Sequence, residues 1–151
     1  MVRHARRKER AQGLIEFALI LPFLCLLIFG VIDFGSGLKA YITTSSAARE
    51  AARYASIGNL GPTSGAYVEC DSETMNAVVL KACGTMGGLT ASYASVKVDC
   101  NPTCVSGASA TVTTQYQYHY ITPLRSIVGL FSGGSLPGYL TVTSSTTMRI
   151  E

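Results

Sequence analysis

This 151-residue chain has five cysteines, whose thiols could form disulfides or bind a metal ion. Cys25 lies in an apolar run and is most simply a small hydrophobic residue there. The other four, Cys70, Cys83, Cys100 and Cys104, form an even set, which in a small exported domain predicts two disulfides. The alternative is a zinc site, because Cys100 and Cys104 have a ligand-like spacing. The other pair lacks that spacing and no histidine lies near it in the sequence, so we favour the disulfides.

Four cysteines allow three pairings, and spacing alone does not choose between them. An Asn-Pro turn between Cys100 and Cys104 favours that short bond, which leaves Cys70 to pair with Cys83. Along a helix predicted over residues 72–86, eleven residues rise about 16 Å. Bridged Cα atoms must lie within roughly 7 Å of each other, so the chain before the helix has to double back. The open alternative joins Cys83 to Cys100 or Cys104 and links a helix to a strand.

Acid–base chemistry would need a histidine or carboxylate placed beside a nucleophile, and the candidates are His119, Asp99 and Glu69. No motif in the sequence brings together a nucleophile, a base and an acid that orients the base. His119 also sits among tyrosines in a predicted strand, where a surface position is more typical than a catalytic one. The sequence therefore favours a protein that is not an enzyme, without a cofactor, a metal ion or a small-molecule substrate.

Glu16 is the most unusual carboxylate, because it lies near the start of a long apolar run. Within residues 14–34 only Glu16 and Asp33 are ionisable. A run of about twenty apolar residues is long enough to cross a bilayer, and a single span can do so only as a helix. A carboxylate inside the membrane edge is costly unless it is paired. Glu16 is therefore either paired with a cation or placed about one helical turn from the interface, where it reaches water.

The basic residues of the chain are concentrated before this apolar run. Five Arg or Lys residues and one Glu give residues 1–11 a net charge of +4, which leaves −1 for the remainder of a chain whose total is +3. This distribution indicates membrane topology rather than nucleic-acid binding. It places residues 1–11 in the cytoplasm and the chain after about residue 35 outside. A removable signal peptide fits less well than a single-pass anchor in the cytoplasmic membrane, because the run is too long and contains Glu16 and Pro22.

The helix is predicted to continue beyond the bilayer. Apolar and small residues recur at three- and four-residue steps through residues 38–55, and a clear stop signal occupies residues 58–62. The chain thus divides into a basic cytoplasmic leader (1–11), a transmembrane and stalk helix (12–57) and an extracytoplasmic domain (58–151).

A stripe of small residues lies on the stalk part of this helix and permits close packing. Two partners are possible: the helix of a neighbouring subunit, or the sheet of the same chain. The stripe consists of Ala47, Ala51 and Ala55 together with Ala48 and Ala52.

The domain after the stalk is predicted to be α+β. A short helix over residues 72–86, capped by Asp71 or Ser72, precedes segments of period two that indicate about three strands. Tyr116, Tyr118 and Tyr120 form a row that is either sheet core or a binding surface. A half-apolar antiparallel sheet needs a cover, which the long and short helices provide. The result is a pilin-like plan.

Three motifs follow one another along the chain: Gln12-Gly13-Leu14-Ile15-Glu16-Phe17-Ala18-Leu19-Ile20-Leu21-Pro22, Asp33-Phe34-Gly35 and Ala47-Ala48-Arg49-Glu50-Ala51-Ala52-Arg53-Tyr54-Ala55. Together with the ending Met148-Arg149-Ile150-Glu151, they resemble the TadE-like family, the minor pseudopilins of tight-adherence (Tad or Flp) pili and relatives of type IV pilins. The resemblance covers residues 5–56, whereas residues 58–138 agree only in general plan. It implies a structural or initiating subunit in the assembly of a pilus for surface adhesion; the alternative is a membrane-anchored extracytoplasmic binding module unrelated to a filament. The implied partners are other pilin subunits, the assembly machinery, the membrane and a prepilin peptidase.

The resemblance also implies processing of the leader. In the family a prepilin peptidase cuts between the basic leader and the apolar helix, typically after a glycine, and a glutamate is then the fifth residue of the mature chain. Counting back from Glu16 places the bond between Ala11 and Gln12. The sequence departs from the pattern because Ala11 stands where glycine is expected. By the same resemblance, Glu16 pairs with the freed α-amine of Gln12 in a neighbouring subunit and sets the axial register.

Overall fold

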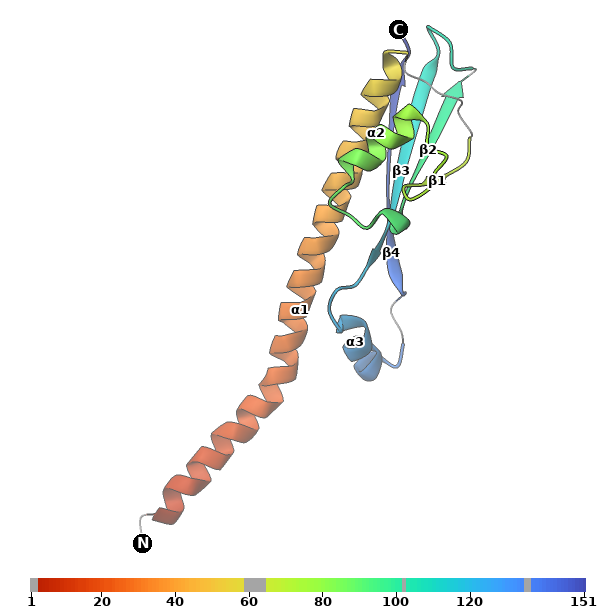
Figure 1. The fold of residues 1–151 in the computed structure, drawn as a ribbon. Helices are drawn as coiled ribbons and strands as arrows, with labels where there is room; N and C mark the ends of the chain where they lie inside the picture. Colours follow the sequence, from red (N-terminus) through yellow and green to blue (C-terminus); the bar gives the residue numbers. More distant parts are fainter. Residues whose placement is uncertain (1–2, 59–64, 102, 135–136) are drawn as a thin grey trace. The chain divides into compact units, whose positions relative to one another are not determined.

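The computed structural model describes residues 3–58, 65–101, 103–134 and 137–151 (Figure 1). The chain divides into two compact units that interleave in the sequence. The helix unit comprises residues 1–35 and 120–137, and the sheet unit comprises residues 36–119 and 138–151. The fold is α+β: a long N-terminal apolar helix, a small antiparallel sheet and shorter helices.

Helix α1 runs from Arg3 to Ser56, which confirms the predicted long helix and extends it into the basic leader. It contains Pro22, and its apolar part bends in the red-to-orange segment of Figure 1, as expected where a proline removes a helical hydrogen bond. The helix ends at the predicted stop. The backbone N–H of Gly58 donates to the carbonyl of Ala55 at 3.2 Å, and Gly58 has a φ of 82°, which glycine adopts without strain.

The sheet has four antiparallel strands in the order β1-β2-β3-β4, one more than the sequence predicted. The additional strand, β1, has only two residues and pairs Val68 with Val96 of β2. The bounds of the strands are Val68–Glu69 (β1), Ala94–Asn101 (β2), Ser109–His119 (β3) and Tyr139–Arg149 (β4).

The core of the sheet unit lies between one face of the sheet and the second half of α1. Alternate residues of β2 and β3 are buried, and the hydroxyl of Thr114 on β3 donates to the carbonyl of Thr44 on α1 at 2.9 Å. Every alanine of the stalk stripe is fully buried within the chain. The chain's own domain therefore covers the stripe, and the structure favours this partner over a neighbouring subunit's helix.

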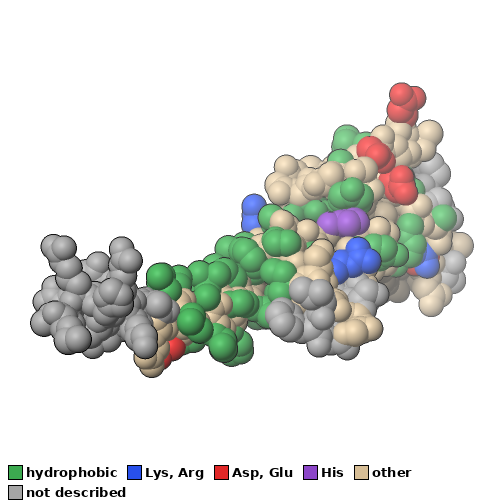
Figure 2. Space-filling view, turned by 90° about the horizontal axis from the view of Figure 1, so that it is seen from below, with side chains coloured by type: hydrophobic (Ala, Val, Ile, Leu, Met, Phe, Trp, Pro, Cys, Tyr) green, Lys and Arg blue, Asp and Glu red, His purple; other side chains and the backbone are tan. Residues whose placement is uncertain are grey.

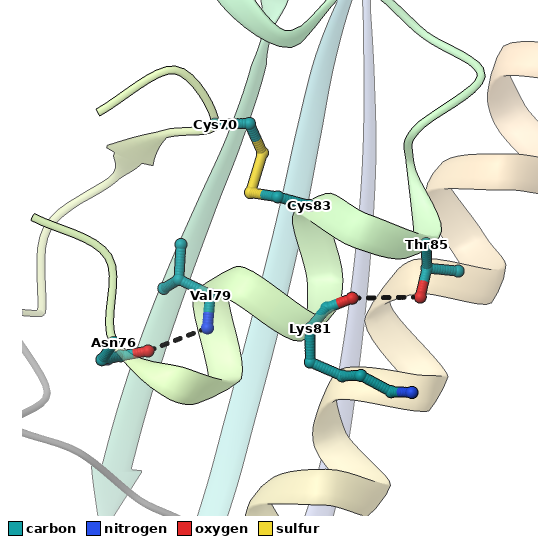
Figure 3. The surroundings of a disulfide bond; sticks show 6 residues. All are labelled: Cys70, Asn76, Val79, Lys81, Cys83 and Thr85. Carbon is teal, nitrogen blue, oxygen red and sulfur yellow. Dashed lines mark hydrogen bonds between the residues drawn. A yellow bond between two sulfur atoms is a disulfide. The ribbon is translucent and has the colours of Figure 1, made fainter. Parts of the chain in front are cut away.

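Helix α2, Ala77–Thr85, is shorter than the predicted helix over residues 72–86. The predicted caps were wrong: the side chain of Asn76 caps the helix by accepting from the N–H of Val79 at 2.8 Å (Figure 3). The Ser72 hydroxyl instead accepts from the backbone N–H of Thr74 at 3.3 Å, in a local turn. The apolar spacing of this segment predicts that Met75, Val78, Val79 and Ala82 face inward. Val78, Val79 and Ala82 are buried, whereas Met75 precedes the helix and is half-buried.

Two further short helices complete the fold. A 3₁₀ turn, Ala91–Tyr93, leads into β2. Helix α3, Leu124–Ser132, begins after Pro123 and ends at Gly133, whose φ of 66° is left-handed. The apolar spacing of residues 123–131 predicts a short helical segment with Phe131 facing inward, but the side chain of Phe131 lies outside the described ones.

Candidate functional site: the apolar helix and its two carboxylates

The apolar half of α1 exposes large hydrophobic side chains. Leu19 is 76% exposed and Phe23 is 74% exposed, and Figure 2 shows hydrophobic side chains gathered along this part of the helix. Among the described residues, one helix, Gln12–Ser56, is long and apolar enough to cross a membrane. Its most apolar window has no buried residue. An N-terminal apolar helix of this kind fits a membrane anchor.

Glu16 lies on the exposed surface of this helix. Its carboxylate accepts from the side-chain amide of Gln12 at 3.4 Å, one turn earlier. The bond between Ala11 and Gln12 lies inside α1, and the side chain of Ala11 is outside the described ones. Gln12 and Glu16 therefore share one helix face, and their exposed polar groups can meet a second molecule.

Asp33, the second carboxylate of the apolar run, is only 5% exposed. Its Oδ1 accepts from the backbone N–H groups of Ile121 at 2.9 Å and Thr122 at 3.3 Å. Its Oδ2 accepts from the hydroxyl of Thr122 at 2.5 Å. These donors stabilise a buried carboxylate at the end of the apolar run, as a buried charge requires.

The Asp33 contact continues into helix α3. The hydroxyl of Thr122 that donates to Asp33 also accepts from the backbone N–H of Leu124 at 3.4 Å, at the first residue of α3. Asp33 is therefore a positioning residue: it holds the backbone immediately before α3, next to the first residue of that helix. Sequence reasoning missed this role; the available signal was a lone acid at the end of an apolar run, which must find donors somewhere in the chain.

The four cysteines of the sheet unit lie in the two favoured pairs. The sulfurs of Cys70 and Cys83 are 2.02 Å apart with Cα atoms at 5.5 Å (Figure 3), and those of Cys100 and Cys104 are 2.08 Å apart with Cα atoms at 5.1 Å. The late start of α2 leaves residues 71–76 free to double back, so that Cys70 reaches Cys83. Cys25 is a free thiol. In the described part of the chain, no group of three or more His, Cys, Asp or Glu residues could hold a metal ion.

The structure does not bring the acid–base candidates together. Asp99 lies opposite Thr111, near the other end of β3 from His119. Its carboxylate is 2.9 Å from the ammonium of Lys97, and its hydrogen bond and charge raise the pKa of that lysine. Glu69 lies exposed on β1.

His119 lies instead in an aromatic cluster on the surface of the sheet unit. Its ring centroid is 4.2 Å from that of Tyr93 and 5.6 Å from that of Tyr139. Its Nδ1 lies 3.1 Å from the carbonyl oxygen of Gln117. Neighbours of this kind orient the ring but supply no nucleophile.

The tyrosine row is core rather than surface over most of its length. Tyr116 and Tyr118 are buried, at 7% and 6% exposure. The ring of Tyr118 lies against Gly37 of α1, where an added methyl group would come within 3.9 Å of it. Tyr120 is half-buried and falls in the helix unit. The row therefore offers little surface for a ligand.

The comparisons with known proteins concern the apolar helix. The family model described as TadE-like protein matches residues 11–53, which confirms the resemblance over the segment that contains both carboxylates and most of the alanine stripe. The match links the chain to the Tad pilus system. No curated protein and no solved structure matches the chain.

Proposed function

We propose that the chain is a minor pilin or pseudopilin, a non-enzymatic structural or initiating subunit in the assembly of a Tad-type pilus for surface adhesion. One observation carries the proposal. The two halves of α1 differ in what covers them: the chain's own domain buries the stalk alanines, whereas the apolar half remains exposed. An apolar helix surface of this size needs lipid before assembly and neighbouring helices within a filament.

The proposed placement is a single pass through the cytoplasmic membrane, with the basic leader inside and the sheet unit outside. Its partners are other pilin subunits, the assembly machinery and a prepilin peptidase. Within the assembly, Glu16 pairs with the freed α-amine of Gln12 of a neighbouring subunit. An exposed carboxylate on an apolar helix supports this role, because pairing removes the cost of taking the charge into an apolar surrounding.

The first test is whether the chain co-purifies with surface appendages of its native host. We expect the chain in the appendage fraction. Glu16→Gln keeps the size of the side chain but removes its charge, so it should lower incorporation while the amount in the membrane is unchanged. The matched control is Glu73→Gln, an exposed acid of the sheet unit. A chain that is absent from appendages, and whose deletion leaves pilus assembly unchanged, contradicts the proposal.

The second test concerns removal of the leader. Intact-mass analysis of protein from the native host should find a chain that begins at Gln12. Ala11→Gly matches the family pattern at the cut and should be processed at least as well. Ala11→Leu should retain the leader, because a bulky side chain replaces the small one before the bond. Native protein that always keeps residues 1–11 argues for a permanent anchor.

A further inference from the structure

Helix α3 has one apolar and one polar side. At 100° per residue, Leu124, Ile127 and Val128 project to one side of the helix axis, while Arg125 and Ser126 project to the other. The described apolar side chains of α3 are half-buried, and Arg125 and Ser126 are exposed. The helix is therefore amphipathic, and its own unit covers its apolar side only in part.

The Asp33 contact places α3 at the end of the apolar run of α1. Asp33 is the last ionisable residue of that run, and it holds Ile121 and Thr122 immediately before α3 begins. Any medium that surrounds the apolar run up to residue 34 therefore also meets the segment that leads into α3.

Two exposed residues beside the Asp33 contact are apolar. Ile121 is 69% exposed, and Phe34, next to Asp33, is 74% exposed. Arg125 is the one charged residue of the segment 120–138. Exposed apolar residues beside the end of a membrane span suit a phospholipid boundary, where acyl chains accept the apolar side.

We infer that α3 is an interfacial helix, which lies along the outer surface of the same bilayer that α1 crosses, with a phospholipid surface as its partner. The inference rests on the proposed membrane insertion of α1. The buried hydrogen bonds of Asp33 would then hold α3 at a fixed depth in the membrane, relative to the end of the α1 span. Removing the subunit from the membrane requires both α1 and α3 to leave lipid.

The chain lacks tryptophan, so a single introduced tryptophan is a clean reporter of lipid contact. The full-length protein is reconstituted into vesicles of phosphatidylcholine and phosphatidylglycerol whose acyl chains carry no bromine, bromine near the headgroup, or bromine near the chain end. Ile127→Trp reports the apolar side of α3 and Ser126→Trp its polar side. Ile121→Trp is a second reporter at an exposed site that requires no space in a core. Phe23→Trp reports insertion of α1, and Val105→Trp reports the loop between β2 and β3.

We expect brominated lipid to quench Ile127→Trp and Ile121→Trp by at least about half as much as Phe23→Trp, because an interfacial helix lies roughly 5–10 Å into the headgroup boundary. Ser126→Trp should be quenched less than Ile127→Trp, and Val105→Trp hardly at all. Quenching of Phe23→Trp without quenching at 121 and 127 overturns the inference and leaves the membrane anchor standing. Equal quenching at Val105 also overturns it, since contact would then not be specific to α3. If Phe23→Trp is not quenched, α1 is not inserted in the bilayer, and both the proposed anchor and this inference are wrong.

Discussion

Replacing both Cys70 and Cys83 with alanine is expected to destabilise the sheet unit by about 3 kcal/mol, from the chain-entropy estimate for a closed loop of this size. The two cysteines are 13 positions apart, so their bond removes considerable freedom from the unfolded chain. It also holds the doubled-back segment against α2, whose buried residues Val78 and Val79 contribute to the core. Without the bond, α2 keeps its Asn76 cap but loses this tether.

The measurement is thermal unfolding of the oxidised full-length protein in detergent, followed by the near-ultraviolet circular dichroism of its tyrosines. We expect the midpoint to fall by roughly 10–20 °C. The double replacement of Cys100 and Cys104 should have a smaller effect, about 2 kcal/mol, because that loop is shorter. Cys25→Ala removes the free thiol and is the control. A peptide map of unreduced protein that joins Cys83 to Cys100 or Cys104 contradicts the pairing, and four free thiols contradict an oxidising compartment.

Replacing Ala51 with leucine is expected to destabilise the sheet unit by about 1–3 kcal/mol, the usual cost of adding a larger side chain to a packed core. Ala51 is 0% exposed, and the hydrogen bond from Thr114 to the carbonyl of Thr44 holds the helix close to the sheet at this level. A leucine can therefore be accommodated only if the helix moves away or neighbouring side chains change rotamer.

The matched control is Ala18→Leu, the same substitution at an exposed position of the same helix. It should leave the unfolding midpoint of the sheet unit unchanged, whereas Ala51→Leu should lower it by roughly 5–15 °C. An Ala51→Leu protein with normal stability that fails to enter pili would reverse the assignment. The stripe would then act in contact between subunits rather than within the chain.

Features carried by local periodicity were predictable from the sequence. The extent of α1, the two-residue period of β2 and β3, and the buried side of α2 all follow from which neighbouring positions are apolar. The use of the alanine stripe was not predictable, because small residues permit close packing against any partner. Only the folded domain shows that β3, with Thr114 donating to Thr44, occupies that side of the helix.

Features that depend on distant parts of the chain were missed. The donors to Asp33 lie 88 and 89 positions later, so no local pattern pairs them. Strand β1 has only two residues and is defined by its pairing with the edge of β2. The start of α2 was placed too early because Asp71 and Ser72 could each act as a cap. Asn76 is the cap in the structure, and the residues before it form the turn through which Cys70 returns to Cys83.

The register of β3 and β4 determines how a water-soluble fragment of this protein should be cut. His119 lies directly opposite Tyr139, and the chain between them leaves the sheet unit for the helix unit. A fragment that simply starts at residue 36 keeps α3 but lacks Asp33, so the donors at Ile121 and Thr122 lose their acceptor and an apolar side is left uncovered. Joining His119 to Tyr139 through an Asn-Gly turn closes the hairpin in its existing register. Such a shortened chain keeps all four strands and both disulfides, and it is the form best suited to work in aqueous solution.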